Sequence, residues 1–231
     1  MKIEVLYSEI CNLYGDNANI DYISKCVLNS KVYYTNINEI PKFVTEDVDL
    51  IYMGPMKEKE RAIVISKLMK YKNRIKELIE NNVHFLMIGN ALEIFGKKID
   101  DIDGLGIFNT ISKTNYDYHH ISCFLGEYDG IKIVGFQSKF SYTYNSDNPF
   151  IKVIHGYGFN DEIEGIHYKN FYGTYLIGPL LINNPYFTKK FLEEFNYPFE
   201  LKYFNDLKIL YKNRLKDFED SRMVYKDRSS F

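Results

Sequence analysis

The strongest constraint on the fold lies in the N-terminal half, where short apolar runs are separated by segments of helical pattern. The runs at 2–7, 31–34, 49–53 and 83–88 have the length and composition of strands. The segment 58–81 instead repeats its apolar residues at helical spacing, with charged residues between them. This alternation predicts an α/β fold with a mostly parallel central sheet and flanking helices.

The C-terminal half has a different pattern, with Gly and Asn turns between its apolar runs. We expect strands at 116–124, 131–137 and 171–177, a helix at 185–195 and an amphipathic helix at 202–220. The polar residues 221–231 are expected to fray. This divides the chain into a main domain, residues 1–200, and a C-terminal helix and tail, residues 201–231.

Composition excludes several classes of protein. The 231 residues carry a net charge of −2, so no basic excess indicates nucleic-acid binding. Three widely spaced cysteines form neither a disulfide framework nor a zinc pattern, and they indicate free thiols in a reducing compartment. The N-terminus has no apolar signal-peptide core, and no run approaches the roughly 20 residues of a membrane span. We therefore expect a cytoplasmic protein.

One turn has the form of a catalytic site without a catalyst. Residues 85–96, FLMIGNALEIFG, pass from an apolar strand through Gly-Asn-Ala into a short helical piece. That is the shape of a nucleophile elbow, which presents a reactive side chain at a tight strand-to-helix turn. The stretch contains no Ser, Cys or Thr, whereas Gly adopts the strained elbow conformation at no steric cost.

Several motifs resemble, in order, the class I glutamine amidotransferases of the cobyric acid synthase type, and most closely the glutaminase subunit of lipid II isoglutaminyl synthase. They are NLYGDNANI at 12–20, DLIYMGPMKEKE at 49–60, the turn at 89–96 and the Gly-Leu-Gly at 104–106. The longest is EGIHYKNFYGTYLIGPLLINNP at 164–185. The resemblance implies a flavodoxin-like three-layer domain, no cofactor and a Mur-ligase-like partner subunit.

The resemblance also implies a reaction that this chain lacks the residues to perform. In the family a Cys thiolate attacks the glutamine amide, and a His activates it and protonates the leaving ammonia. Gly89 stands at the Cys position and Ile177 at the His position. Pro55 interrupts the oxyanion loop, because it has no N–H to donate. The paired loss predicts a non-catalytic homologue that acts by binding a ligase-like partner or a ligand.

We expect a vestigial pocket in place of the active site. Its residues would be Gly54, Gly89, Asn90, Glu93, Gln137, Lys139 and Ile177. Glu93 replaces a family Gln, so its carboxylate is expected to face the mouth. A Glu93–Lys139 salt bridge could close the pocket, or the two charges could bind a zwitterion. We favour closure or no role for the pair, because surface charge pairs are common and weak.

Two alternatives remain open from the sequence. The chain could be an active amidotransferase that transfers amide nitrogen in cell-wall or cobalamin synthesis through other residues, and Cys123 is the obvious candidate thiol. We favour a structural role for Cys123, because it lies in a predicted strand away from the elbow. Alternatively, the remodelled pocket could sense a small molecule. The acidic clusters at 100–103 and 161–164 are interpreted as solvated loops rather than metal sites.

Overall fold

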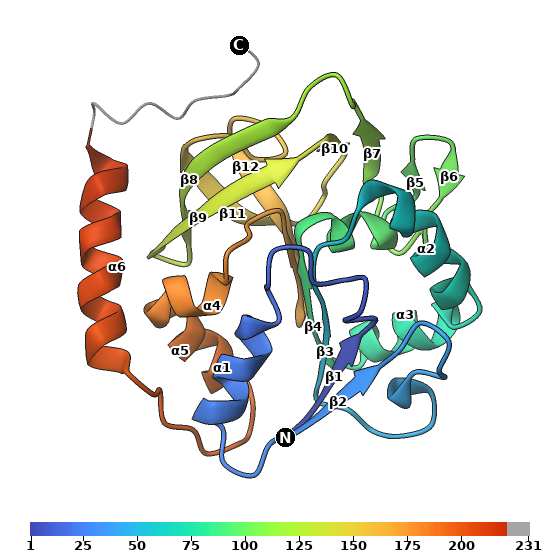
Figure 1. Cartoon of the computed structure of the whole chain (residues 1–231), viewed down its shortest axis with the longest axis horizontal. Coiled ribbons are helices and arrows are strands. Elements are labelled where there is room, and N and C mark those ends of the chain that lie inside the picture. Colours follow the sequence, from blue (N-terminus) through green and yellow to red (C-terminus); the bar gives the residue numbers. More distant parts are fainter. Residues whose placement is uncertain (221–231) are drawn as a thin grey trace.

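A nine-stranded sheet forms the centre of the protein, and a small four-stranded sheet lies beside it (Figure 1). The computed structural model describes residues 1–220. The central sheet has the order β2-β1-β3-β4-β13-β12-β11-β8-β9, and the small sheet has the order β10-β7-β5-β6. The expectation that residues 221–231 fray lies outside the described residues.

The strands and helices have the following bounds. The central strands are β1 (Lys2–Leu6), β2 (Lys31–Thr35), β3 (Leu50–Met53), β4 (His84–Ile88), β8 (His120–Tyr128), β9 (Ile131–Lys139), β11 (Pro149–His155), β12 (Ile163–Tyr168) and β13 (Phe171–Thr174). The small sheet contains β5 (Lys98–Ile99), β6 (Ile102–Asp103), β7 (Ile111–Thr114) and β10 (Ser141–Tyr144). The α-helices are α1 (Ala18–Cys26), α2 (Arg61–Met69), α3 (Lys72–Glu80), α4 (Leu180–Asn183), α5 (Pro185–Glu193) and α6 (Phe204–Glu219). Short 3-10 helices are η1 (Lys42–Val44), η2 (Glu58–Glu60) and η3 (Gly89–Phe95).

The parallel half of the central sheet confirms the predicted α/β class. Strands β2, β1, β3, β4 and β13 pair in parallel, and β1 to β4 are labelled in the lower half of Figure 1. Every residue of β3 and β4 is buried, as expected for parallel strands covered by helices on both faces. Their continuous apolar runs explain why these strands could be recognised in the sequence.

The antiparallel half differs in detail from the sequence prediction. Strands β12, β11, β8 and β9 extend the sheet from β13 by antiparallel pairing. The predicted strand at 116–124 is displaced, because β8 begins at His120 and residues 111–114 form β7 of the small sheet. Strands β10, β11 and β12 were not predicted. Their sequences mix exposed and buried residues, so they lack the long apolar run that marks β3 and β4.

Helices cover the two faces of the parallel strands. On one face, α2, α3 and η1 pack over a core that includes Phe43, Val64 and Leu78. On the other face, α1, α4 and α5 pack over a second core. The predicted helix 58–81 is in fact divided at Lys70–Tyr71, and the Tyr71 ring packs edge-on against Phe43 with centroids 6.1 Å apart. Within the described residues, no helix is long and apolar enough to span a membrane.

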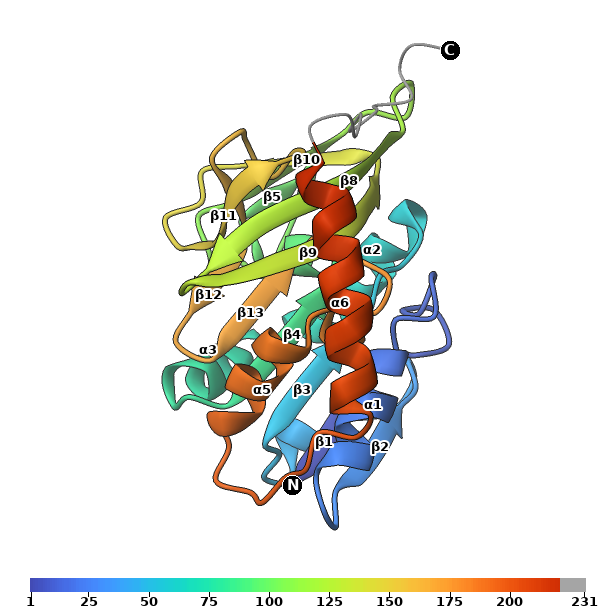
Figure 2. The same ribbon diagram turned by 90° about the vertical axis from the view of Figure 1, so that its left-hand side faces the viewer.

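Helix α6 crosses the antiparallel half of the sheet (Figure 2). Tyr211 and Phe218 are buried against Leu125 and Val134 of β8 and β9. The Tyr211 hydroxyl also donates to the Lys132 carbonyl at 2.7 Å. The helix spans 204–219, close to the predicted 202–220. The division of the chain into a domain at 1–200 and a C-terminal region at 201–231 stays a prediction. It can be tested by removing the contacts that α6 makes with the sheet.

Candidate functional site

The turn at Gly89 keeps the backbone geometry of an elbow. Gly89 directly follows β4 and has φ +64°, in the left-handed region that favours glycine. The chain then continues into η3 at the carboxyl edge of the parallel strands, where open α/β sheets place their sites.

Pro55 occupies the space that an elbow side chain would need. A Cβ atom built on Gly89 would lie 2.6 Å from the Pro55 Cβ and 3.3 Å from its Cα, both closer than ordinary contact. The loop after β3 is itself tightly held, since a Cβ on Gly54 would lie 2.5 Å from the Cys11 carbonyl oxygen. A nucleophile at position 89 therefore cannot be accommodated unless Pro55 moves.

The same loop is bonded to the turn by a reciprocal pair of hydrogen bonds. The Met56 N–H donates to Asn90 Oδ1 at 2.9 Å, and Asn90 Nδ2 donates to the Met56 carbonyl at 2.8 Å. The Pro55 carbonyl accepts from the Leu13 N–H at 2.9 Å. Pro55 has no N–H and the Met56 N–H already has an acceptor, so neither residue can donate to an oxyanion.

Little space remains above the turn. The hollow bordered by Tyr14, Pro55, Gly89, Asn90 and Lys139 has a volume of about 10 Å³. That is about the space of one water molecule and far below that of a typical ligand pocket. The predicted Glu93–Lys139 salt bridge does not form, because Glu93 pairs with Arg61, so that bridge is not what narrows the hollow.

Glu93 does not face the mouth, which corrects the sequence expectation. Its side chain is fully buried, and Oε2 accepts from Arg61 Nη1 at 2.5 Å. Its other oxygen accepts from the Tyr175 hydroxyl at 2.8 Å. The reason is the winding of η3. A 3-10 helix turns by about 120° per residue, so Glu93 does not share a face with Gly89 as it would in an α-helix.

The Arg61–Glu93 pair is the centre of a buried polar network. Arg61 also donates to Ser141 Oγ at 2.9 Å and to Thr114 Oγ1 at 2.8 Å. The Tyr175 hydroxyl shares a 2.6 Å hydrogen bond with Thr143 Oγ1. Burial raises the pKa of the Glu93 carboxyl, although the Arg61 charge opposes this effect. The network joins α2, η3 and the small sheet.

Lys139 is also placed differently from the expectation, because it pairs with a ring rather than with Glu93. Its ammonium lies 4.1 Å from the centroid of the Tyr175 ring and donates to the Gly158 carbonyl at 3.2 Å. Burial lowers the pKa of the Lys139 ammonium to about 8, although Glu164 and Glu93 act in the opposite direction. Since Arg61 already neutralises Glu93, Lys139 is left to interact with the aromatic face.

The two other predicted site residues lie nearby on β9 and after β13. Gln137 is buried, and its side-chain amide has no hydrogen-bond partner within residues 1–220. Ile177 packs in the apolar core on the α1 side, and its N–H donates to the Phe136 carbonyl at 2.9 Å. Among the described residues, Ile177 is not one of those that border the hollow above Gly89.

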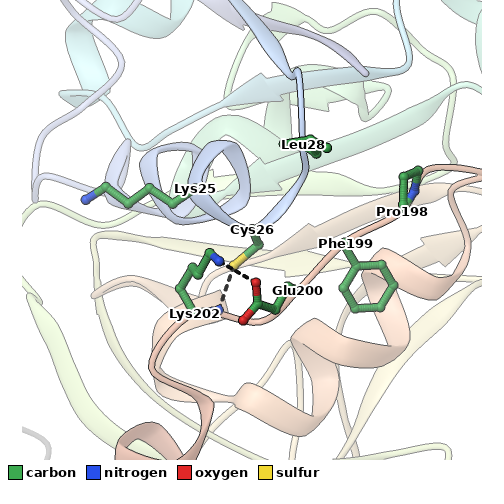
Figure 3. A pocket seen from close by; sticks show the side chains of 7 residues that line it. All are labelled: Lys25, Cys26, Leu28, Pro198, Phe199, Glu200 and Lys202. Atoms are coloured by element: carbon green, nitrogen blue, oxygen red, sulfur yellow. Dashed lines mark hydrogen bonds and ion pairs between the residues drawn. The ribbon is translucent and has the colours of Figure 1, made fainter.

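Cys123 and Cys26 do not border the hollow above Gly89. Burial raises the pKa of the Cys123 thiol, and this residue lies on β8 near the residues that α6 covers. Cys26 borders a separate hollow of about 270 Å³ between α1 and residues 198–202 (Figure 3). There its Sγ accepts from the Lys202 N–H at 3.5 Å, next to the Lys202–Glu200 ion pair. Within residues 1–220, no group of acidic, His and Cys side chains could hold a metal ion.

Sequence reasoning missed two residues that hold the site together. Arg61 lies in the segment 58–81, where its charge gives no signal that distinguishes it from the other charged residues of a helix. Asp16 lies in the 12–20 motif, and its Oδ1 accepts from the Gly178 N–H at 2.9 Å. Burial raises the pKa of the Asp16 carboxyl to about 6, against the effect of that hydrogen bond. Through this bond the 12–20 and 164–185 motifs meet in space.

The fold and the elbow define the class of protein. Two solved glutamine amidotransferases have the same fold. One is from Thermotoga maritima, with a TM-score of 0.52, 13% identity and coverage of 94% of this chain and 91% of the other. The second has a TM-score of 0.57, 9% identity and coverage of 82% and 97%.

The family follows from the sequence comparison. Residues 2–185 match the CobB/CobQ-like glutamine amidotransferase domain, and the chain belongs to this family. It is similar to the lipid II isoglutaminyl synthase (glutamine-hydrolyzing) subunit GatD of Staphylococcus aureus, with 36% identity over 84% of this chain and 86% of the relative. It is also similar to the Streptococcus pneumoniae subunit of the same name, with 30% identity over 80% and 76%.

Proposed function

We propose that this chain is a GatD-type amidotransferase domain that does not hydrolyse glutamine and acts by binding a ligase-like partner. The observation that carries the proposal is the position of Pro55, which packs against Gly89 where an elbow nucleophile would stand. Loss of the thiol alone would leave an empty pocket. Here the space is filled and the loop is bonded to the turn, so the fold is adapted to the absence of the nucleophile.

Two observations support a partner: the names of the relatives and the motif that this chain keeps. Both bacterial relatives are named as subunits of a synthase, so they act as part of an assembly. This chain keeps the 164–185 motif, in which Gly178 binds Asp16 of the N-terminal motif, although the reactive residues have changed. We infer that binding to a partner is the property for which the domain is kept.

The first experiment tests the absence of glutaminase activity. Purified wild-type chain is incubated with L-glutamine and the release of glutamate is measured, with a glutamine-hydrolysing relative as positive control. We expect no release above the buffer rate. Release that is absent from a mock purification would contradict the proposal. Its loss in Cys123→Ala would identify the Cys123 thiol as the nucleophile, and its persistence would favour an enzyme that uses other residues.

A set of restoring variants tests the role of Pro55 separately. The double variant Gly89→Cys/Ile177→His is expected to remain inactive, and its new thiol is expected to resist iodoacetamide. Adding Pro55→Gly should expose that thiol to labelling, because it removes the ring from the space beside position 89. Rapid labelling of the double variant with Pro55 still present would show that Pro55 does not close the site.

The second experiment tests the partner. The chain is tagged at its native expression level, and the proteins that co-purify with it are identified by mass spectrometry. We expect a Mur-ligase-like protein in comparable molar amount, and none with an unrelated tagged α/β protein. Recovery of the chain without such a ligase would remove the basis for a binding role in an amidating assembly.

A further inference from the structure

A second pocket lies at the carboxyl edge of the sheet, between the loops that follow β1 and β3. Its volume is about 380 Å³, and it is lined by Ser8, Glu9, Asn12, Lys57 and Glu60 with two apolar residues. We call it the switch-point pocket. It is distinct from the closed hollow above Gly89 and lies within the size range of small-molecule sites.

The strand order places this pocket where α/β sheets bind ligands. In the order β2-β1-β3-β4, the chain leaves β1 and β3 toward opposite faces of the sheet. Helix α1 follows β1 and packs on one core, whereas α2 follows β3 and packs on the other. The two loops therefore diverge and leave a crevice, which is the topological switch point of the fold.

The pocket walls are held in place by hydrogen bonds within the loops. Tyr7 has φ +57°, and its carbonyl accepts from the N–H groups of Ile10 at 2.9 Å and Cys11 at 2.7 Å. Glu9 Oε1 accepts from the Ile37 N–H at 2.6 Å, and Glu60 Oε2 accepts from the Lys57 N–H at 3.1 Å. Each carboxylate is thus fixed by one oxygen. Within residues 1–220, the other oxygen of each carboxylate accepts no hydrogen bond from the loops that line the pocket.

The charges in the pocket are of both signs and do not neutralise one another. Among the ion pairs of residues 1–220, none joins Lys57 to Glu9 or Glu60, although all three line the same space. Burial is the main cause that raises the pKa of the Cys11 thiol, and the negative charges of Glu60 and Glu9 raise it further. Both carboxylates therefore act electrostatically on the same thiol. Glu9 and Lys57 are exposed and Glu60 is half-buried, so all three charges are accessible to a ligand that carries the complementary charges.

We propose that the switch-point pocket binds a diamino monocarboxylic acid of the lysine type. Two carboxylates, from Glu9 and Glu60, match the two ammonium groups of such a ligand, and Lys57 matches its carboxylate. Ser8 and Asn12 supply further polar groups for the ligand backbone. This inference goes beyond the proposed function and does not depend on it, because the pocket is complete within one chain.

Calorimetric titration of the full chain with L-lysine tests the proposal. Two matched probes each remove one charge, since L-norleucine lacks the side-chain ammonium and cadaverine lacks the carboxylate. We expect saturable binding of L-lysine that is about tenfold tighter than binding of either probe. Absence of saturable lysine binding, or equal binding of norleucine, would overturn the proposal.

Variants then locate the site. Glu9→Gln and Glu60→Gln should each weaken lysine binding about fivefold to tenfold, and Lys57→Met should weaken binding of lysine but not of cadaverine. Glu58→Gln is the matched control, because Glu58 borders the hollow above Gly89 instead. Lysine binding that survives all three pocket variants would place the ligand elsewhere and refute the assignment. The glutamate-release and co-purification assays of the wild-type chain are run without lysine. Their results therefore test the proposed function independently of lysine binding.

Discussion

At the scale of single residues, the site is shaped by the mutual fit of Gly89 and Pro55. Gly89 keeps a left-handed turn that any other residue would strain, and Pro55 fills the space that a side chain would take. While Pro55 is present, a larger residue at position 89 would clash with its ring. The local packing therefore leaves no room for a side chain at position 89.

Gly89→Ala should destabilise the fold by about 2–4 kcal/mol, because it combines a strained φ with a steric clash. Gly130→Ala is the matched control. Gly130 has φ +74°, but a Cβ there would meet nothing within 4 Å, so only the backbone strain applies. Urea unfolding of both variants measures the difference. Equal losses of unfolding free energy would show that Pro55 yields without cost.

Asp16→Asn should make the stability less dependent on pH. The pKa of Asp16 is raised from 3.8 to about 6 in the folded state, so folding favours its protonated form. Its contribution is fully present below pH 3.8 and is lost as the pH rises through about 6. At pH 7 the wild type should therefore have lost on the order of 1–3 kcal/mol relative to pH 4 that the variant keeps. Urea unfolding at pH 4, 5, 6 and 7 measures this, and a constant difference between the proteins would contradict it.

At the scale of elements, short helices and loops decide which side chains meet. The 3-10 winding of η3 turns Glu93 away from the elbow and toward Arg61 at the start of α2. Loops after β1, β3 and β13 are joined by the Leu13–Pro55 and Asp16–Gly178 hydrogen bonds. At the carboxyl edge of the sheet, the hollow above Gly89 therefore has a volume of only about 10 Å³, whereas the switch-point pocket has about 380 Å³.

Removal of either partner of the buried Arg61–Glu93 pair should cost about 3–5 kcal/mol, because it leaves a buried charge without its partner. The double variant Arg61→Met/Glu93→Gln should cost clearly less than the sum of the single variants. The exposed pair Lys189–Glu193 provides the control, and Glu193→Gln should change the unfolding free energy by less than about 0.5 kcal/mol. Strict additivity in the Arg61–Glu93 cycle would show that the two side chains do not interact energetically.

At the scale of the whole molecule, α6 connects the C-terminal region to the sheet. Phe218 lies with its ring centroid 5.7 Å from that of Phe136 and covers the outer face of β8 and β9. These contacts make α6 part of the cover of the antiparallel half. A boundary at residue 200 would leave that face of the sheet exposed.

Phe218→Ala should lower the unfolding free energy of the whole domain by about 3 kcal/mol, because the ring is almost fully buried. Ile209→Ala on the same helix is the control. Its side chain is 60% exposed, so the change should stay within about 0.5 kcal/mol. Thermal and urea unfolding measure both. An equal, small effect of the two variants would support an independent C-terminal appendage from residue 201.

The sequence by itself determined the class of fold and the family. Buried parallel strands such as β3 and β4 must be apolar throughout, so their runs are visible in one dimension. The strands β10, β11 and β12 were missed, because half-buried strands depend on neighbours that are distant in the chain. The replacements at Gly89 and Ile177 could also be read from the sequence, because motif positions identify them.

Only the tertiary structure decided how the space around Gly89 is filled. Pro55 and Gly89 are 34 positions apart in the printed numbering, and their contact arises because β3 and β4 pair in parallel and end together. Arg61 meets Glu93 because η3 winds as a 3-10 helix, which no motif predicts. The switch-point pocket arises because successive helices leave adjacent strands toward opposite faces. Residue types are local properties of the chain. The shapes of the hollow above Gly89 and of the switch-point pocket instead depend on which loops the sheet brings to the same edge.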